Sequence, residues 1–106
     1  MFDYNPYYNP EKLDLEILCT LDEAISYEFN MLVVWRHLPT GKLYWATDSG
    51  CSCPTPFENH CSLDSLNSLG NVTEWMSFER AVRDFPVPAH ERQDLLSKAR
   101  RGFKGR

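Results

Sequence analysis

Two consecutive stretches of the chain alternate apolar and polar residues, and this period of two constrains the fold more than any other feature. Residues 13–21 carry an apolar side chain at every odd position, and residues 27–37 repeat the pattern. A period of two is typical of a β-strand with one buried face. Pro39 and Gly41 then indicate a hairpin turn, and residues 42–47 follow as a return strand. We therefore predict a three-stranded antiparallel meander.

The alternation also predicts which side chains are buried. Cys19 belongs to the apolar set of the first strand, so we expect it to be a buried small hydrophobe rather than a ligand. Leu32 and Val34 interrupt the polar face of the second strand, so part of that strand is covered on both sides or forms an interface. The face that we expect the helices to seal carries Leu15, Ile17, Phe29, Val33 and Trp35.

The pattern changes to a helical period near residue 71. Asn71 and Thr73 are both possible N-caps. With Asn71 as the cap, Glu74 lies three residues on, as in a capping box, and the helix runs to about Phe85. Pro88 can open a second helix, and Gly102 is a plausible C-terminal stop. The apolar stripes are Trp75, Phe78, Val82 and Phe85 in the first helix, and Leu95, Leu96, Ala99 and Phe103 in the second.

A length of 106 residues fits one domain. We predict a single α+β domain: a three-stranded antiparallel β-meander followed by a Cys-containing loop and two C-terminal helices packed on the sheet. Its parts are an N-terminal arm (1–11), the meander (12–47), the Cys loop (48–70) and a helical region (71–106). Within the Cys loop, Leu63 to Leu69 suggests a short helical turn or a packed loop. A domain of this size can fold without disulfides or metal.

Charge is spread unevenly along the chain. Residues 1–64 carry ten acidic and three basic residues, whereas residues 65–106 carry five acidic and eight basic residues. Because the net charge is −4, we favour a solvated helix with a basic end over a nucleic-acid tail. Nucleic-acid contact by the basic C-terminal helix stays open as an alternative. Its basic residues are Arg92, Lys98, Arg100, Arg101, Lys104 and Arg106.

Three of the four cysteines lie close together after the third predicted strand. Cys51, Cys53, His60 and Cys61 have the donor atoms of a tetrahedral zinc site, but four ligands from one short loop, two of them adjacent, are poor spacing. A redox pair is less favoured, because no helix N-terminus or basic group lies nearby in sequence to lower a thiol pKa. A cysteine nucleophile is less favoured, because nothing in the spacing places a histidine beside a thiol. We therefore predict no cofactor and keep zinc as an alternative.

Aromatic residues exceed what the predicted core needs. They either form a protein-binding surface or belong to an arm and loop that fold back over the second face of the sheet, and the sequence leaves both open. No phosphate loop, dinucleotide fingerprint or nucleophile elbow occurs, so we predict no catalytic residues and no enzyme. The N-terminus has neither a basic start nor a long apolar run, from which we expect a cytosolic protein that contacts no membrane. The binding residues that we predict are Tyr44, Asp48, Cys51, Cys53, Phe57 and Glu58.

The run from Leu43 to Glu58, containing W-A-x-D-S-G-C-S-C-P-x-P-F-E, resembles a motif in small uncharacterised proteins of actinobacterial tailed phages. The likeness covers roughly residues 13–70. It implies expression in the host cytoplasm and a small accessory role, in which the partner is a host or phage protein. The resemblance carries no assigned activity. A homodimer is left open, and the alternative function is a small zinc-binding domain with nucleic-acid contact through the basic helix.

Overall fold

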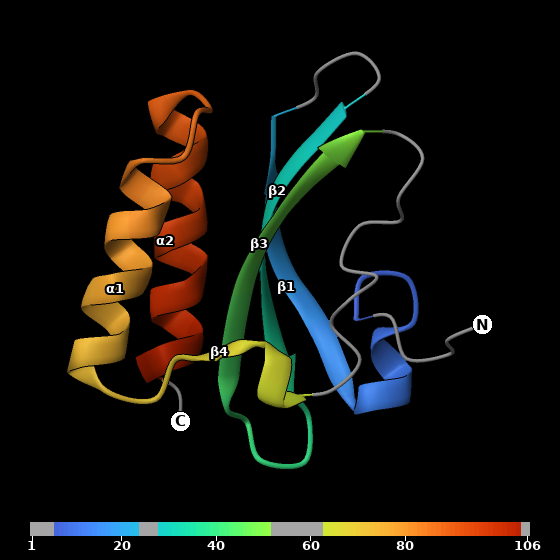
Figure 1. Cartoon of the computed structure of the whole chain (residues 1–106). Coiled ribbons are helices and arrows are strands. Elements are labelled where there is room, and N and C mark those ends of the chain that lie inside the picture. Colours follow the sequence, from blue (N-terminus) through green and yellow to red (C-terminus); the bar gives the residue numbers. More distant parts are fainter. Residues whose placement is uncertain (1–5, 24–27, 52–62, 105–106) are drawn as a thin grey trace.

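The fold is a four-stranded antiparallel sheet with two helices on one face and the N-terminal segment on the other (Figure 1). The computed structural model describes residues 6–23, 28–51 and 63–104. The α+β class and the two C-terminal helices are as predicted, whereas the sheet, ordered β1-β2-β3-β4, has one more strand. In chain order the elements are η1 (Pro10–Leu13), β1 (Leu15–Asp22), β2 (Glu28–His37), β3 (Leu43–Cys51), η2 (Leu63–Ser65), β4 (Asn67–Ser68), α1 (Val72–Arg83) and α2 (Ala89–Lys104).

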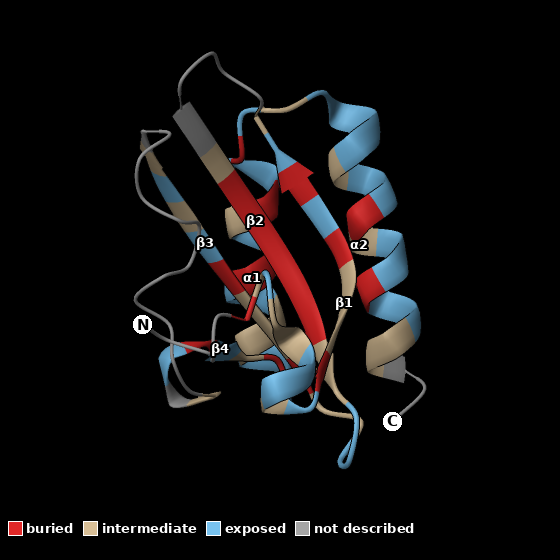
Figure 2. Ribbon diagram, turned by 90° about the vertical axis from the view of Figure 1, so that its right-hand side faces the viewer, coloured by how far each residue is buried: buried red, intermediate tan, exposed pale blue. Residues whose placement is uncertain are grey.

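Both faces of the sheet are buried, and each has its own hydrophobic cluster. Figure 2 shows the central strand β2 buried along most of its length. Tyr7 and Leu13, from the N-terminal segment, pack against the cluster on the face opposite the helices, which we call the arm-side core. The arm-side core consists of Leu15, Met31, Val33, Trp35, Ala46 and Leu66. The helix-side core consists of Cys19, Leu21, Leu32, Val34, Leu43, Leu69, Phe78, Val82, Phe85, Leu95 and Ala99.

The predicted assignment of the two faces was wrong. Val33 and Trp35 lie in the arm-side core, whereas the helices cover Leu32 and Val34. The prediction that part of β2 is covered on both sides is confirmed. An alternation of apolar and polar residues indicates which side chains share a face of the strand, but it does not indicate which layer of the fold covers that face. The prediction placed the helices on the more apolar face. Phe29, assigned to the same face, has a side chain outside the described part of the chain.

A β-bulge at Leu18 divides the apolar residues of β1 between the two cores. The pairing with β2 shifts between Ile17 and Cys19, so Leu18 is an extra residue. An extra residue turns every later side chain to the opposite face. Leu15 and Ile17 therefore join the arm-side core, while Cys19 and Leu21 join the helix-side core. The prediction that the apolar residues of β1 all lie on one face is therefore wrong.

The hairpin turn is confirmed, because Gly41 adopts a positive φ of 75°. The strand that follows, β3, runs to Cys51, four residues past the predicted end, so the first part of the predicted Cys loop is strand. The short helical turn predicted after residue 62 is η2. The unpredicted β4 pairs with Tyr44 and Trp45 of β3.

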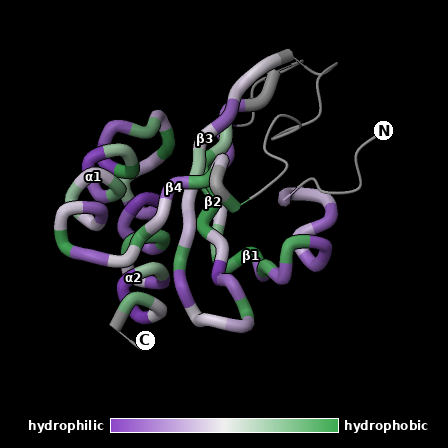
Figure 3. Tube along the Cα trace, turned by 60° about the horizontal axis from the view of Figure 1, so that its bottom comes forward, coloured by the Kyte–Doolittle hydropathy of each residue, from purple (hydrophilic) through white to green (hydrophobic). Residues whose placement is uncertain are grey.

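Both predicted helices form, with different ends. The Asn71 side chain accepts a hydrogen bond of 2.8 Å from the Glu74 N–H, which confirms the predicted cap, and α1 ends at Arg83. The predicted stop at Gly102 is wrong, because α2 continues to Lys104. Gly102 instead lies where the helix approaches the sheet. Figure 3 shows hydrophobic and hydrophilic positions alternating around both helices, which is the pattern of helices buried on one side.

Candidate functional site

The structure places three of the predicted binding residues on β3 and describes the side chains of two of them, Tyr44 and Asp48. Tyr44 and Asp48 are four positions apart on the arm-side face, about 13 Å along the strand. The Tyr44 ring lies 5.6 Å from the Lys42 ammonium and contacts the His37 ring edge-on at 6.5 Å. Asp48 lies opposite Met31. The two residues therefore share a face without forming one site.

Of the other predicted binding residues and the predicted zinc ligands, the structure describes only the backbone of Cys51. Cys51 is the last position of β3, with its backbone opposite Glu28, and its side chain is not described. Within residues 6–23, 28–51 and 63–104 no three His, Cys, Asp or Glu side chains converge as metal ligands do. The zinc alternative therefore stays a prediction. The residues outside the described ranges are Cys53, Phe57, Glu58, His60 and Cys61.

Cys19 is a buried free thiol, as predicted. Its side chain is 9% exposed, and its Sγ lies 4.0 Å from the Leu95 carbonyl oxygen. Burial raises the pKa of the Cys19 thiol from 9.0 to about 11, although Lys98 nearby favours the thiolate. A thiol with this pKa is protonated at neutral pH, so Cys19 packs as a hydrophobe and is a poor nucleophile.

Several basic side chains of α2 make contacts inside the molecule. Arg92 donates hydrogen bonds to the carbonyl oxygens of Phe85 and Val87, which holds the turn between the helices. Lys98 pairs with Asp94 at 3.3 Å. Arg100, described below, also has a partner within the molecule, so three of the six basic residues predicted for the C-terminal helix make intramolecular contacts. Arg106 lies outside the described residues, as does the Lys104 side chain.

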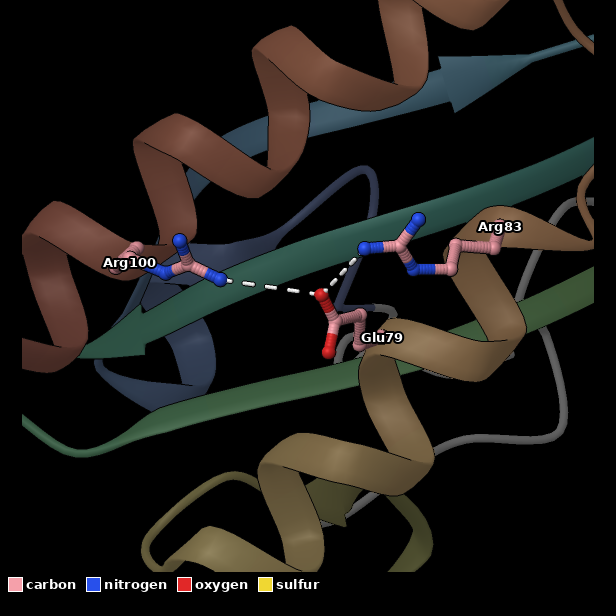
Figure 4. A network of polar contacts seen from close by, with 3 residues as sticks. All are labelled: Glu79, Arg83 and Arg100. Carbon is pink, nitrogen blue, oxygen red and sulfur yellow. Dashed lines mark hydrogen bonds and ion pairs between the residues drawn. The ribbon is translucent and has the colours of Figure 1, made fainter.

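A polar network joins α1 to α2 around Glu79 (Figure 4). The Glu79 carboxylate accepts a hydrogen bond of 2.9 Å from Arg83 and lies 3.9 Å from Arg100. The Arg100 guanidinium also stands 5.2 Å from the centre of the Trp75 ring, a cation–π distance. These contacts join α1 to α2 and give the Arg100 guanidinium partners within the molecule.

Two adjoining open depressions lie along α1, one between the helix and the β3–β4 edge and one on the exposed side of the helix, and the sequence analysis missed them. One depression is lined by Trp45, Leu66, Asn67, Ser68, Thr73, Glu74 and Ser77. A second is lined by Thr73, Met76, Ser77, Glu79, Arg80, Arg83 and Asp84. Because both include Thr73 and Ser77, we treat them as one surface, the α1 groove.

Two large apolar side chains stand exposed at the start of this helix. Val72 is 70% exposed and Met76 is 63% exposed, one turn apart on α1. They lie outside the stripe of Phe78 and Val82 that packs on the sheet. The spacing of Val72 and Met76 was the available signal, because two apolar residues at i and i+4 off the core stripe indicate a second apolar surface.

The cap of α1 fixes the groove relative to the sheet. The Glu74 carboxylate accepts hydrogen bonds from the Ser68 hydroxyl and from the Gly70 N–H at 2.7 Å. These two bonds lower the pKa of Glu74, the Ser68 bond most, so the carboxylate is charged at neutral pH. Since Ser68 belongs to β4, the same side chain caps the helix and ties it to the edge of the sheet.

No described helix combines the length and the apolar character that crossing a membrane requires. No curated protein and no solved structure gives a significant match to the chain. One family does match, over residues 4–103, and this includes every described strand and nearly all of α2. The chain therefore belongs to the family described as "Domain of unknown function (DUF7574)".

Proposed function

We propose that this protein acts by binding another protein and catalyses no reaction. The observation that carries the proposal is the exposed pair Val72 and Met76 beside the α1 groove. Exposed apolar side chains that adjoin a groove with a polar rim are typical of interaction sites. Trp45, a residue type enriched in binding hot spots, lies in the groove lining.

The chemistry of the groove supports binding rather than catalysis. Its lining combines aromatic and apolar side chains with hydroxyl groups and with both charge signs. The carboxylate of Glu74 is engaged in capping the helix, and that of Glu79 holds two arginines. Groups already committed to structural contacts are poorly placed for proton transfer.

The proposed setting is the cytoplasm of a phage-infected bacterium, where the chain serves as a small accessory protein. The support for this setting is the likeness of the run from Trp45 to Glu58 to the actinobacterial phage motif. The proposed partner is a host or phage protein. The predicted loop surface that starts at Asp48 remains a second candidate for its docking site.

Quantitative capture from bacterial lysate tests the proposal. The wild-type chain is compared with the double variant Val72→Ser/Met76→Gln, which keeps residues compatible with a helix start and a helix interior. Leu38→Ser is the matched control, because Leu38 is 55% exposed but lies on the hairpin away from the groove. We expect at least one protein enriched by wild type and Leu38→Ser and lost with the double variant.

Two further measurements sharpen this result. The enriched protein, once purified, should bind the wild-type chain at a fixed stoichiometry in a calorimetric titration. A Cys51→Ser/Cys53→Ser variant tests the loop surface in the same capture. If no protein is enriched over empty beads, or if every variant captures the same set equally, the proposal is wrong.

A further inference from the structure

The outer edge of β3 extends beyond the end of β4. β4 pairs only with Tyr44 and Trp45, whereas β3 continues to Cys51. Thr47 and Ser49 lie in this extension, and both are exposed. On its other side, β3 pairs with β2 without a break over the same residues, so the sheet holds the extension in a regular strand conformation.

The hydrogen-bond pattern shows which way the backbone groups of the extension point. The His37 N–H donates to the Lys42 carbonyl oxygen at 2.8 Å, so even-numbered residues of β3 bond to β2. Odd-numbered residues point their N–H and C=O groups outward, where the Leu43 carbonyl oxygen accepts a 2.9 Å bond from the Leu69 N–H. Both exposed residues of the extension are odd-numbered, and no strand in the described part of the chain pairs with their outer sides. Such backbone groups form a template for another strand.

Asp48 places a carboxylate beside this edge. Its side chain projects from β3 between Thr47 and Ser49, on the arm-side face. If an antiparallel strand is added at the edge, the residue opposite Asp48 forms a non-hydrogen-bonded pair with it, in which side chains approach most closely. Opposite charges in such a pair stabilise a sheet, and like charges destabilise it. Only the charge of Asp48 matters here, because a carboxylate accepts more than one donor.

The strands around this edge carry no positive charge near Asp48. Asp22 lies in the same row of the sheet, because it pairs with Met31, which in turn pairs with Asp48. Arg36 is the one arginine or lysine on β1, β2 and β3, and it lies about 17 Å from Asp48 along the strand direction. The charge at this end of the described sheet is therefore negative, and it favours a basic occupant.

We propose that an extended basic segment of a partner protein adds to the sheet along Thr47 and Ser49, antiparallel to β3, and places a lysine or arginine opposite Asp48. This inference rests on the proposed protein-binding function and gives that function a second surface. β4 already runs antiparallel to β3 at the same edge, so the added segment continues the line of β4 along the sheet. Main-chain hydrogen bonds give strand addition its affinity, and side-chain contacts give it specificity.

The opposite edge of the sheet, formed by β1, is less suited to strand addition. The extra residue Leu18 forms a bulge, which is a common protection of an edge strand against pairing with another chain. Thr20 on β1 nevertheless gives a matched control. It is exposed, and its backbone groups point outward because its partner Val33 bonds to β3.

A titration of the ¹⁵N-labelled chain by nuclear magnetic resonance tests the inference. The probe is an octapeptide that alternates threonine and valine around one central lysine, and its control carries glutamate instead. We expect the lysine peptide to shift the amide signals of Thr47 and Ser49 in a saturable way, but not that of Thr20. The glutamate peptide should bind about tenfold more weakly. Asp48→Lys should reverse this preference, whereas Asp84→Lys, at an exposed site after α1, should leave it unchanged.

Two modified peptides test the main-chain pairing without any change to the protein. In the proposed register the lysine opposite Asp48 points its own backbone groups away from β3, whereas its two neighbours bond to Thr47 and Ser49. Methylation of the backbone nitrogens of these two neighbours should therefore abolish binding at concentrations that saturate with the unmodified peptide. Methylation of the backbone nitrogen of the lysine should not.

Several results would overturn the inference. These are no saturable shift of the Thr47 and Ser49 signals with the lysine peptide, equal binding of the two methylated peptides, or a preference for lysine that persists in Asp48→Lys. Self-association of the chain at the same edge would make a second copy the occupant, and the inference of a basic segment would be wrong.

The capture from lysate separates this inference from the proposed function. Thr47→Pro removes only an outward N–H, which an edge strand tolerates, and it should weaken capture if the partner adds a strand. If Thr47→Pro still captures the partner that Val72→Ser/Met76→Gln loses, protein binding stands and only strand pairing fails.

Discussion

The indole N–H of Trp35 donates a 2.8 Å hydrogen bond to the carbonyl oxygen of Pro6, and both residues are fully buried. The two residues are 29 positions apart in the chain. This bond fastens the N-terminal segment over the arm-side core, on the face that the helices leave uncovered. The segment is therefore a layer of the fold, with its own buried polar contact.

Trp35→Phe should lower the free energy of unfolding by about 2–4 kcal/mol, because it leaves the buried Pro6 carbonyl without its donor and opens a small cavity. Urea denaturation measures this change. Trp75→Phe is the control, since Trp75 is only partly buried on the helix side, and it should cost less. Equal losses in the two variants would contradict a special role for the Trp35 hydrogen bond.

The local elements of this fold could be predicted from sequence, but their assembly into layers could not. The periods of β1, β2 and the helices depend on residues close in the chain, and so does the Asn71 cap. The bulge at Leu18 does not, because it depends on how β1 meets β2, and no breaker residue marks it. The face of β2 that the helices cover also depends on how the layers pack, and the alternation within β2 does not indicate it.

The candidate site also combines residues that the sequence indicates with a groove that only the assembled fold provides. Val72 and Met76 were visible in the sequence as apolar residues off the core stripe, but their significance depends on the groove beside them. That groove requires β4, which is only two residues long and has no strand pattern of its own. Gly102 was misread for a related reason, because close approach to the sheet and a helix stop both favour glycine.

Glu74→Gln should destabilise the protein by about 0.5–1.5 kcal/mol at neutral pH, because Glu74 links the start of α1 to β4 through charged hydrogen bonds. The folded-state pKa of Glu74 is lowered, so its contribution is present above the ordinary value of 4.5 and is lost as pH falls through the folded value. Thermal denaturation near pH 7 and near pH 2 should therefore show a difference only at the higher pH.

Glu91→Gln provides the control for a general effect of charge at a helix start. Glu91 is the acidic residue in the first turn of α2 and is exposed. Its substitution should change the stability less than Glu74→Gln does at neutral pH. A Glu74→Gln penalty that persists unchanged in acid would show that the charge of the carboxylate is irrelevant.

Cys19 should make the protein less stable at high pH. Its folded-state pKa of about 11 exceeds the ordinary value of 9.0, so between these values the unfolded chain loses a proton that the folded chain keeps. Stability is therefore full below pH 9.0 and falls as pH rises towards 11, by at most roughly 2–3 kcal/mol. Under reducing conditions, urea unfolding of wild type and Cys19→Ala should converge with rising pH. Curves that stay parallel would contradict this titration.

Gly102 should tolerate a methyl group but not a large side chain. A Cβ at this position would lie 3.4 Å from one methyl carbon each of Leu18 and Leu43. Gly102→Ala should therefore be neutral or stabilising by up to about 1 kcal/mol, since alanine favours the helix. Gly102→Leu should destabilise by about 1–3 kcal/mol, because the helix would have to move away from β1 and β3. Ser97, exposed on the same helix, is the control site, where leucine should cost little. Urea denaturation of the three variants measures these changes in stability. An equal effect of leucine at positions 97 and 102 would show that α2 is not in close contact with the sheet at Gly102.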